Sequence, residues 1–176
     1  TLWKALGDLY LKVLKHTDGA MMAYQVVAAG SPEDAAVQEM YAEMASQKPG
    51  EESKAEEAYL EASRCGCPPH PGLALLRLAQ GRVDAAAAAI RTALDEAQDR
   101  VARAKMLVAY AEIVLAADDV AAAQTAAEEL SQLAGDLGMP FLHAVAAHAT
   151  GATLLAEGDP RAALPTLRRA WAAWQE

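Results

Sequence analysis

The residues that come closest to a chemical site are Cys65, Cys67 and His70, in the stretch Cys-Gly-Cys-Pro-Pro-His-Pro-Gly at 65–72. Thiolates and an imidazole are ligands that zinc accepts, but zinc sites usually use four ligands at wider cysteine spacing. No second group of ligands follows in the sequence. The three prolines explain the stretch as a rigid loop between helices. We therefore expect no metal ion here.

Two further groups of polar residues invite a catalytic interpretation and do not support it. His143 and His148 are five residues apart on a predicted helix, so they point to different faces, and no carboxylate lies between them as in a metallopeptidase helix. Paired acids at 51–52, 56–57 and 128–129 suit solvated helix faces and i,i+4 partners. The sequence has no phosphate-binding loop and no nucleophile flanked by a base. We expect a protein that is not an enzyme and needs no cofactor.

Charge and composition exclude other classes of function. The formal net charge of −9 argues against nucleic-acid binding, which usually needs a basic stripe. No apolar run approaches the roughly 18 residues that a membrane span requires, and no secretory leader pattern opens the chain. The only two cysteines, Cys65 and Cys67, are too close in sequence for an ordinary disulfide staple. We expect a cytoplasmic protein.

The first 32 residues contain a pattern that predicts a pair of helices, the kind of element that would position any site. Trp3, Leu6, Gly7 and Tyr10 form the pattern W-x2-L-G-x2-Y on one predicted helix. A second predicted helix carries a stripe of small, aromatic and small residues, and a proline follows: Ala20, Tyr24, Ala28 and Pro32. This pattern resembles the tetratricopeptide repeat (TPR) signature, in which helix pairs stack because one pair cannot bury its apolar face alone. Gly7 would let the second helix approach closely.

The stripe recurs along the chain and predicts the fold class. Its further copies are Ala55-Tyr59-Ala62, Ala86-Ile90-Ala93 and Ala163-Leu167-Ala170. We expect a first helical pair at 1–30 with Thr17 or Asp18 as the second N-cap, and a third helix begun by Ser31 as N-cap with Pro32 in its first turn. Later helices are predicted at 52–64, 73–80, 83–97, 99–116, about 119–135, 140–157 and from 160, where Asp119 and Asp159 are expected caps and Pro165 a kink. The sequence predicts one all-α domain over 1–176, a right-handed α-solenoid of about five antiparallel helix pairs.

Basic residues are unevenly distributed. Five of the six lysines precede residue 55, and all nine arginines follow it. The two residue types are interchangeable on most solvated faces, so folding does not require the split. One interpretation is uneven drift in a natural protein. The other is an engineered chimera of repeat fragments with a splice seam near 53–64.

The later part of the chain resembles a known family. The stretches that carry the resemblance are 71–82 with 85–91, and 154–159 with 162–164 and 167–171. They are similar to the helical-repeat region of actinobacterial LuxR-type transcriptional regulators, over about residues 55–176. In those regulators this region lies between a nucleotide-binding module and a C-terminal helix-turn-helix, and the resemblance implies a role in sensing or assembly. Residues 1–50 look instead like a generic bacterial TPR.

Several residues are candidates for contact with a partner. The first helix of each pair normally lines a concave groove, where alignment of the turns places Lys4, Asp8, Lys12, Leu107, Tyr110, Val114, His148 and Leu155. The set of Lys, Arg and Asn that clamps a peptide carboxylate is not found, so an apolar groove for an amphipathic protein or peptide helix is expected. A weaker alternative is a small-molecule pocket near Tyr110, His143 and His148.

The last predicted helix carries two tryptophans, Trp171 and Trp174, near its end. They suit an end-to-end contact with a second copy of the chain. Alternatively they fold back on the preceding helix, which we expect more of Trp171 than of Trp174. Two functional hypotheses follow: a non-enzymatic scaffold, engineered or chimeric, without chemistry of its own, or the interaction and sensor region of a LuxR-type regulator that binds a partner helix.

Overall fold

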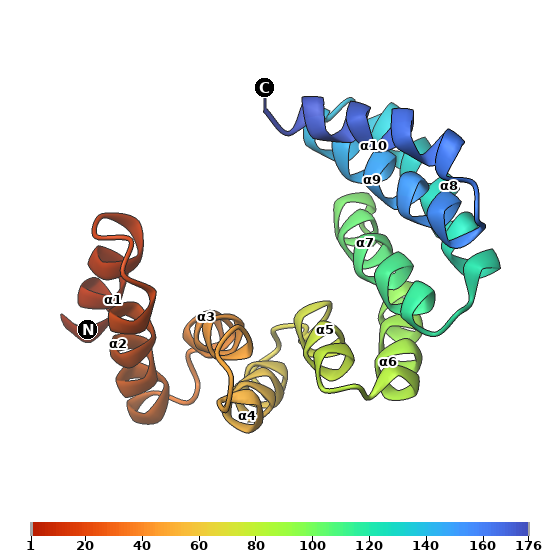
Figure 1. The fold of residues 1–176 in the computed structure, drawn as a ribbon. Helices are drawn as coiled ribbons and strands as arrows, with labels where there is room; N and C mark the ends of the chain where they lie inside the picture. Colours follow the sequence, from red (N-terminus) through yellow and green to blue (C-terminus); the bar gives the residue numbers. More distant parts are fainter. Residues whose placement is uncertain (1, 176) are drawn as a thin grey trace. The chain divides into compact units, whose positions relative to one another are not determined.

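The computed structural model describes residues 2–175, and within them it has ten helices and no strand, packed as consecutive antiparallel pairs (Figure 1). The earlier helices are α1 (Leu2–Lys12), α2 (Thr17–Gly30), α3 (Ala35–Ser46), α4 (Glu52–Arg64) and α5 (Gly72–Ala79). The later ones are α6 (Val83–Glu96), α7 (Arg100–Ala116), α8 (Val120–Leu137), α9 (Pro140–Ala156) and α10 (Pro160–Ala173). The predicted all-α, TPR-like array of helix pairs is confirmed.

The chain divides into two compact units, the first ending at Leu76 and the second beginning at Arg77. This boundary lies inside α5, whereas the predicted seam at 53–64 lies within α4, which is one continuous helix. The single-domain organisation stays a prediction. Each unit is described by itself below.

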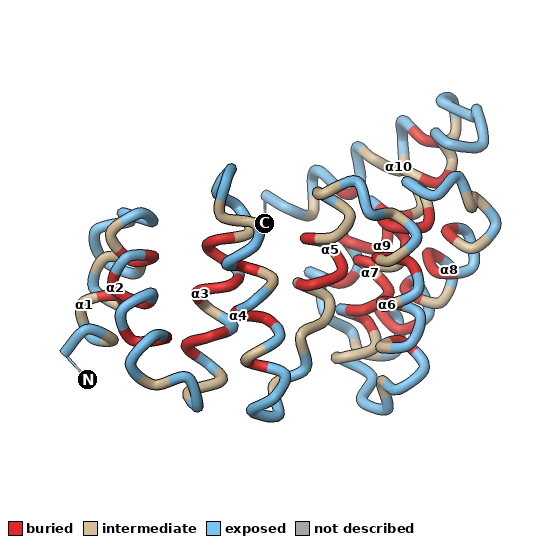
Figure 2. The backbone as a smooth tube through the Cα atoms, turned by 90° about the horizontal axis from the view of Figure 1, so that it is seen from below, coloured by how far each residue is buried: buried red, intermediate tan, exposed pale blue. Residues whose placement is uncertain are grey.

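Large side chains pack the first unit. Tyr24 of α2 is fully buried, and a Cβ placed on Gly7 of α1 would lie only 3.0 Å from its Cζ. The missing side chain of Gly7 thus leaves room for the tyrosine ring, as the sequence predicts. The core continues into Val37 and Tyr41 of α3 and Tyr59 of α4. Figure 2 shows buried stretches recurring along α2, α3 and α4, whereas α1 is mostly exposed or half-buried.

Alanine dominates the core of the second unit, and glycine again permits a close approach. A Cβ placed on Gly151 of α9 would lie 2.5 Å from Cδ2 of Leu167 on α10. Leu167 is flanked by the buried stripe residues Ala163 and Ala170. In the last helix pair, as in the first, a glycine on one helix leaves room for a large side chain of the next, here a leucine and there a tyrosine.

The helix starts agree with the sequence in the second unit. The side chain of Asp119 accepts a hydrogen bond from the Ala122 N–H at 3.1 Å, and that of Asp159 accepts one from the Ala162 N–H at 3.0 Å. Both aspartates are the predicted N-caps. Pro165 lies inside α10, and the helix continues past it to Ala173.

Two predicted caps in the first unit are wrong. The N-cap of α2 is His16, whose Nδ1 accepts a hydrogen bond from the Gly19 N–H at 2.9 Å, so Thr17 and Asp18 lie within the helix. The N-cap of α3 is Asp34, whose Oδ1 accepts a hydrogen bond from the Val37 N–H at 3.2 Å, whereas Ser31 is the C-cap of α2 and its N–H donates to the Val27 carbonyl.

Among the described residues, no helix has the length and apolar character needed to cross a membrane.

Candidate functional site

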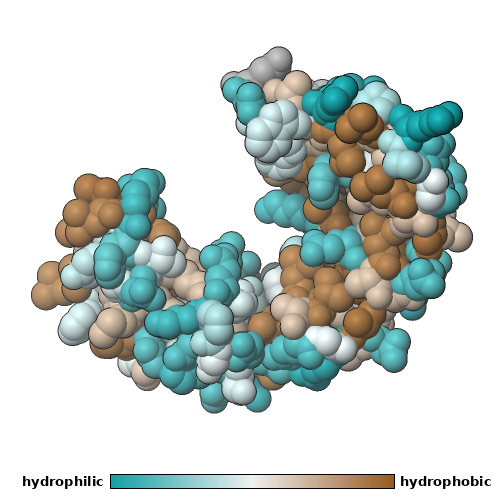
Figure 3. Space-filling model, in the orientation of Figure 1, coloured by the Kyte–Doolittle hydropathy of each residue, from teal (hydrophilic) through white to brown (hydrophobic). Residues whose placement is uncertain are grey.

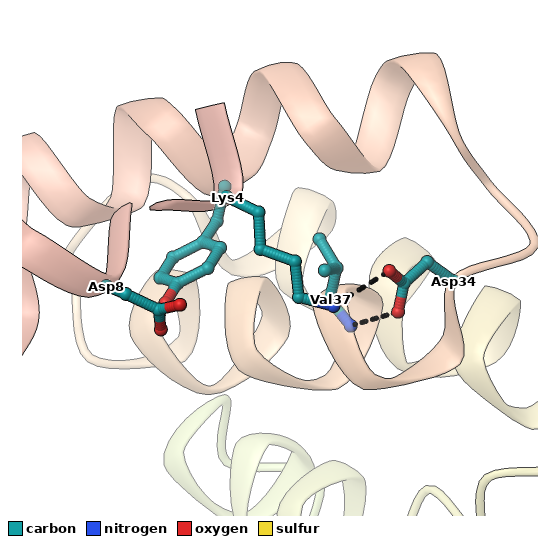
Figure 4. A network of polar contacts seen from close by, with 5 residues as sticks. Lys4, Asp8, Asp34 and Val37 are labelled. Carbon is teal, nitrogen blue, oxygen red and sulfur yellow. Dashed lines mark hydrogen bonds and ion pairs between the residues drawn. The ribbon is translucent and has the colours of Figure 1, made fainter. Parts of the chain in front are cut away.

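The three candidate groove residues of α1 take part in polar contacts within the first unit, and Figure 4 shows two of them, Lys4 and Asp8. Lys4 Nζ lies 2.9 Å from Asp34 Oδ2, at the start of α3. The Tyr24 hydroxyl donates a hydrogen bond to Asp8 Oδ1 at 2.8 Å, and Lys12 Nζ lies 3.3 Å from the same oxygen. These contacts connect α1 to α2 and to α3.

The network shifts the acidity of its members. The hydrogen bond from Tyr24, followed by the contact with Lys12, lowers the pKa of Asp8. Burial, followed by the hydrogen bond to Asp8, raises the pKa of Tyr24 to about 12. The hydrogen bond from Lys4 lowers the pKa of Asp34. The network thus favours ionised aspartates and a neutral tyrosine, which suits a structural role. Contact of Lys4, Asp8 and Lys12 with a partner stays a prediction.

The candidate residues of α7 and α9 separate into two sets. Leu107 and Val114 are fully buried and belong to the core, so they offer no surface to a partner. Tyr110 is half-buried beneath the guanidinium of Arg91, which lies 6.0 Å from the ring centroid. His148 and Leu155 are exposed on α9. Helices α7 and α9 contact each other, so this second set lies on neighbouring helices.

The cysteine loop is held by hydrogen bonds to the chain around α3. Cys65 Sγ donates to the Pro32 carbonyl at 3.5 Å, and Cys67 Sγ donates to Glu39 Oε2 at 3.2 Å. Burial and then the Glu39 carboxylate raise the pKa of Cys67 to about 11, which disfavours the thiolate that would bind a metal. Within residues 2–175, no three His, Cys, Asp or Glu side chains are grouped so that they could hold a metal ion.

The two C-terminal tryptophans differ in their environment. Trp174 packs edge-on against Phe141 of α9, with ring centroids 5.2 Å apart, and it remains half-exposed. Trp171 is 68% exposed. We predicted that Trp171 would fold back more readily, and this is wrong. Because α9 and α10 are antiparallel, the end of α10 lies beside the start of α9, where Trp174 contacts Phe141.

Apolar side chains also gather over α1 and its turn into α2 (Figure 3). Trp3, the first residue of the TPR-like motif, is half-exposed. Val37, which lies one repeat of about 34 residues later, is fully buried in the core that α2, α3 and α4 share. The exposed apolar residues of this region are Leu2, Trp3, Leu9, Val13, Leu14, Met22 and Val26.

Two cavities, one in each unit, were not foreseen from the sequence. The first has about 530 Å³ and is lined by Gln25, Ala28, Ala29, Pro32, Gln38, Tyr41, Lys54, Glu57, Ala58 and Glu61. The second has about 400 Å³ and is lined by Gln124, Ala127, Glu128, Ser131, Gln132, Thr150, Thr153, Leu154 and Glu157. Neither is lined by the residues of the predicted small-molecule pocket, Tyr110, His143 and His148.

Comparison with known proteins supports the fold. The structure is similar to the crystal structure of MamA protein, a TPR protein, with a TM-score of 0.64 and 15% sequence identity. The similarity covers 99% of this chain and 91% of that one. No family model matches the sequence, and no curated protein matches it. At this identity the likeness establishes a TPR-like helical-repeat fold.

Proposed function

We propose that this chain is a non-enzymatic scaffold that associates with a second copy of itself through the outer face of α10. A TPR-like fold suits protein–protein interaction. The observation that carries the proposal is the exposure of Trp171. Together with Leu164, which is also exposed, it lies on one face of α10 because the two residues are seven positions apart.

The same positions in α2 indicate what covers such a face. Leu164 and Trp171 lie three residues before and four residues after the stripe residue Leu167. The corresponding neighbours of Tyr24 are Met21 and Ala28. These two are only 6% and 7% exposed, and they share a core cluster with Val37 and Tyr41 of the following helix. The α10 face thus corresponds to a surface that a further helix normally covers.

A second copy of the chain can supply that helix from its own α1. Trp3 on α1 is exposed at the position where Val37 on α3 is buried against its neighbours. Contact between α1 of one copy and α10 of another would use two different surfaces, and such heterologous contacts form rings or open arrays.

Light scattering tests this association. We expect the wild type to show a mass above that of the monomer, and Trp171→Glu to return it to the monomer. Leu155→Glu, a change at another exposed apolar residue of the second unit, serves as the matched control and should leave the mass unchanged. A monomeric wild type at high concentration would contradict the proposal.

The second candidate function is the binding of an amphipathic helix by α7 and α9, as in the interaction region of a LuxR-type regulator. The exposed pair His148 and Leu155, seven residues apart, supports it because both lie on one face of α9, a helix that contacts α7, which carries half-buried Tyr110. Titration with an amphipathic helical peptide should shift the amide signals of these residues, and Leu155→Ala should weaken binding. Signals that shift only on α10 would assign the peptide to the first surface.

A chimeric or engineered origin is supported by the division between lysine-rich and arginine-rich parts of the sequence and by the different resemblances of residues 1–50 and 55–176. One natural protein that contains residues 1–52 and 66–176 contiguously would rule this origin out.

A further inference from the structure

The cavity in the first unit is formed by three helices and one loop. Its walls come from α2, from the loop residue Pro32, and from α3 and α4. Its volume of about 530 Å³ lies within the range of about 300–1,000 Å³ that is usual for ligand pockets. Alanines 28, 29 and 58 and Pro32 give it apolar surface, and polar side chains from α3 and α4 complete it.

The side chain of Gln38 is held in this cavity by a hydrogen bond to a backbone carbonyl that has no backbone donor. The carbonyl of Ala28 lies four residues before Pro32, which has no N–H to donate to it. Gln38 Nε2 donates to this carbonyl at 3.0 Å instead. The side chain is only 5% exposed, and its Oε1 accepts no hydrogen bond from any residue in 2–175. The cavity therefore contains an immobilised acceptor without a donor.

Tyr41 adds a second polar group without a partner. The residue is 6% exposed, lines the same cavity, and its hydroxyl makes no hydrogen bond within the described part of the chain. Burial raises its pKa, so the hydroxyl remains neutral under ordinary conditions. Its oxygen is not among the fully enclosed unpaired atoms of the described residues, so the hydroxyl is accessible and can bond to a ligand in the cavity.

The charged residues of the wall favour a cation. The lining contains one lysine and two glutamates, a formal charge of −1. Lys54 Nζ lies 2.7 Å from Glu51 Oε2, so its charge is already paired. Glu57 and Glu61 are one helical turn apart, and Glu61 lies 2.6 Å from Arg64 Nη1. The carboxylate of Glu57 makes no hydrogen bond or ion pair with residues 2–175.

We propose that this cavity binds a guanidinium group, with the carboxylate of Glu57, the Gln38 Oε1 and the Tyr41 hydroxyl as its acceptors. A guanidinium presents five N–H donors in a plane, which suits acceptors on two different helices better than the compact ammonium of lysine. An arginine side chain from a partner protein also has an aliphatic stem, which the alanines and Pro32 would contact. The site is separate from the α10 face.

Calorimetric and NMR titration of the full chain with acetyl-Gly-Arg-Gly-amide tests the proposal. The matched probe is the same peptide with citrulline, an uncharged analogue of arginine of nearly equal shape. We expect saturable binding of the arginine peptide with shifts at Gln38, Tyr41 and Glu57, and at least about tenfold weaker binding of the citrulline peptide. Equal binding of the two peptides, or no binding up to about 5 mM, would overturn the proposal.

Agmatine, a free guanidinium compound, separates the two sources of this chemistry. Tighter binding of the peptide assigns the site to a partner protein, and equal binding assigns it to a small cation.

Variants locate the site. Glu57→Gln should weaken binding of the arginine peptide about tenfold and Tyr41→Phe about threefold, with helical content unchanged. Glu128→Gln in the second cavity is the matched control and should leave binding unaltered. Wild-type affinity in Glu57→Gln would place the guanidinium elsewhere. Because none of these changes touches α10, the oligomeric mass and the peptide affinity report separately on the two proposals.

Discussion

Gln38 in the first unit and Thr153 in the second are the two buried polar residues of the described chain, and they use their hydrogen bonds differently. Gln38 reaches from α3 to the Ala28 carbonyl, ten residues earlier on α2. Thr153 donates to the Ala149 carbonyl of its own helix at 3.0 Å. Gln38 lines the cavity described in the first unit and Thr153 the one described in the second. The Gln38 amide keeps its oxygen as a further acceptor, whereas the Thr153 hydroxyl already donates within its own helix.

The difference extends to the surrounding residues. In the second cavity, Ser131 and Thr150 also bond to carbonyls four residues earlier, at 2.8 and 2.9 Å. Such bonds satisfy a hydroxyl without connecting helices. Polar contacts connect helices in both units: Lys4–Asp34 and Tyr24–Asp8 in the first, and Arg103–Glu129 between α7 and α8 in the second. The difference lies in the cores, because the first contains large tyrosine side chains whereas the second consists mostly of alanines on closely packed helices.

We expect the largest difference in stability when the two stripe residues that pack on a glycine, Tyr24 and Leu167, are each replaced by alanine. Tyr24→Ala removes a fully buried ring and should lower the free energy of unfolding by about 3–5 kcal/mol. Leu167→Ala removes a half-buried leucine and should cost about 1–2 kcal/mol. Denaturant titration measures the loss of unfolding free energy in each variant. Amide exchange in α1–α2 and in α9–α10 shows which helix pair is destabilised. Equal losses would break the comparison.

Replacement of the buried polar residue should also destabilise the protein more in the first unit, at Gln38, than in the second, at Thr153. Gln38→Leu leaves the Ala28 carbonyl without a donor and should destabilise the protein by about 1–3 kcal/mol. Thr153→Val removes a hydroxyl whose acceptor belongs to its own helix, and should change stability by less than about 1 kcal/mol. Denaturation midpoints measure both. A larger loss for Thr153→Val would mean that hydroxyl bonding matters more in the second unit than the geometry implies.

Alkaline pH offers a smaller test of the first unit alone. The pKa of Tyr24 is raised to about 12 in the folded protein, so the neutral side chain contributes to the free energy of unfolding. This contribution is fully present below about pH 10, the pKa of an unfolded tyrosine, and is lost as the pH rises toward 12. We expect the wild type to lose about 1–2 kcal/mol more than Tyr24→Phe across this interval. Urea midpoints at several pH values measure the difference, and parallel curves for the two proteins would contradict the assignment.

The sequence predicts the repeating elements well because they depend on local patterns. The stripe residues Tyr24, Tyr59 and Ile90 are buried as expected, and the predicted helix at 52–64 agrees with α4 to the residue. His16 was missed because Thr17 and Asp18 have the higher capping preference, whereas Asp34 was missed because Ser31 caps about equally well and comes first in the sequence. The place where the preceding helix ends decides the second case, since Ser31 is the C-cap of α2.

The candidate sites were harder to predict because they depend on packing between helices. Leu107 and Val114 are buried because α7 contacts α6, α8 and α9, so the side expected to face a groove is covered. The cavity at Gln38 and Tyr41 was missed entirely. Its one signal in the sequence is Pro32, four residues after Ala28, which implies an unpaired carbonyl but does not reveal which side chain would pair with it.

Burial of Cys67, followed by its hydrogen bond to Glu39, makes the two thiols of one loop chemically unequal. Maleimides react with thiolates, and a pKa of about 11 keeps nearly all of Cys67 protonated at neutral pH. Cys65, only two residues away, is exposed. A fluorophore supplied in limiting amount should therefore couple to Cys65 first, which would give a singly labelled protein without mutagenesis, with the dye in the loop between α4 and α5.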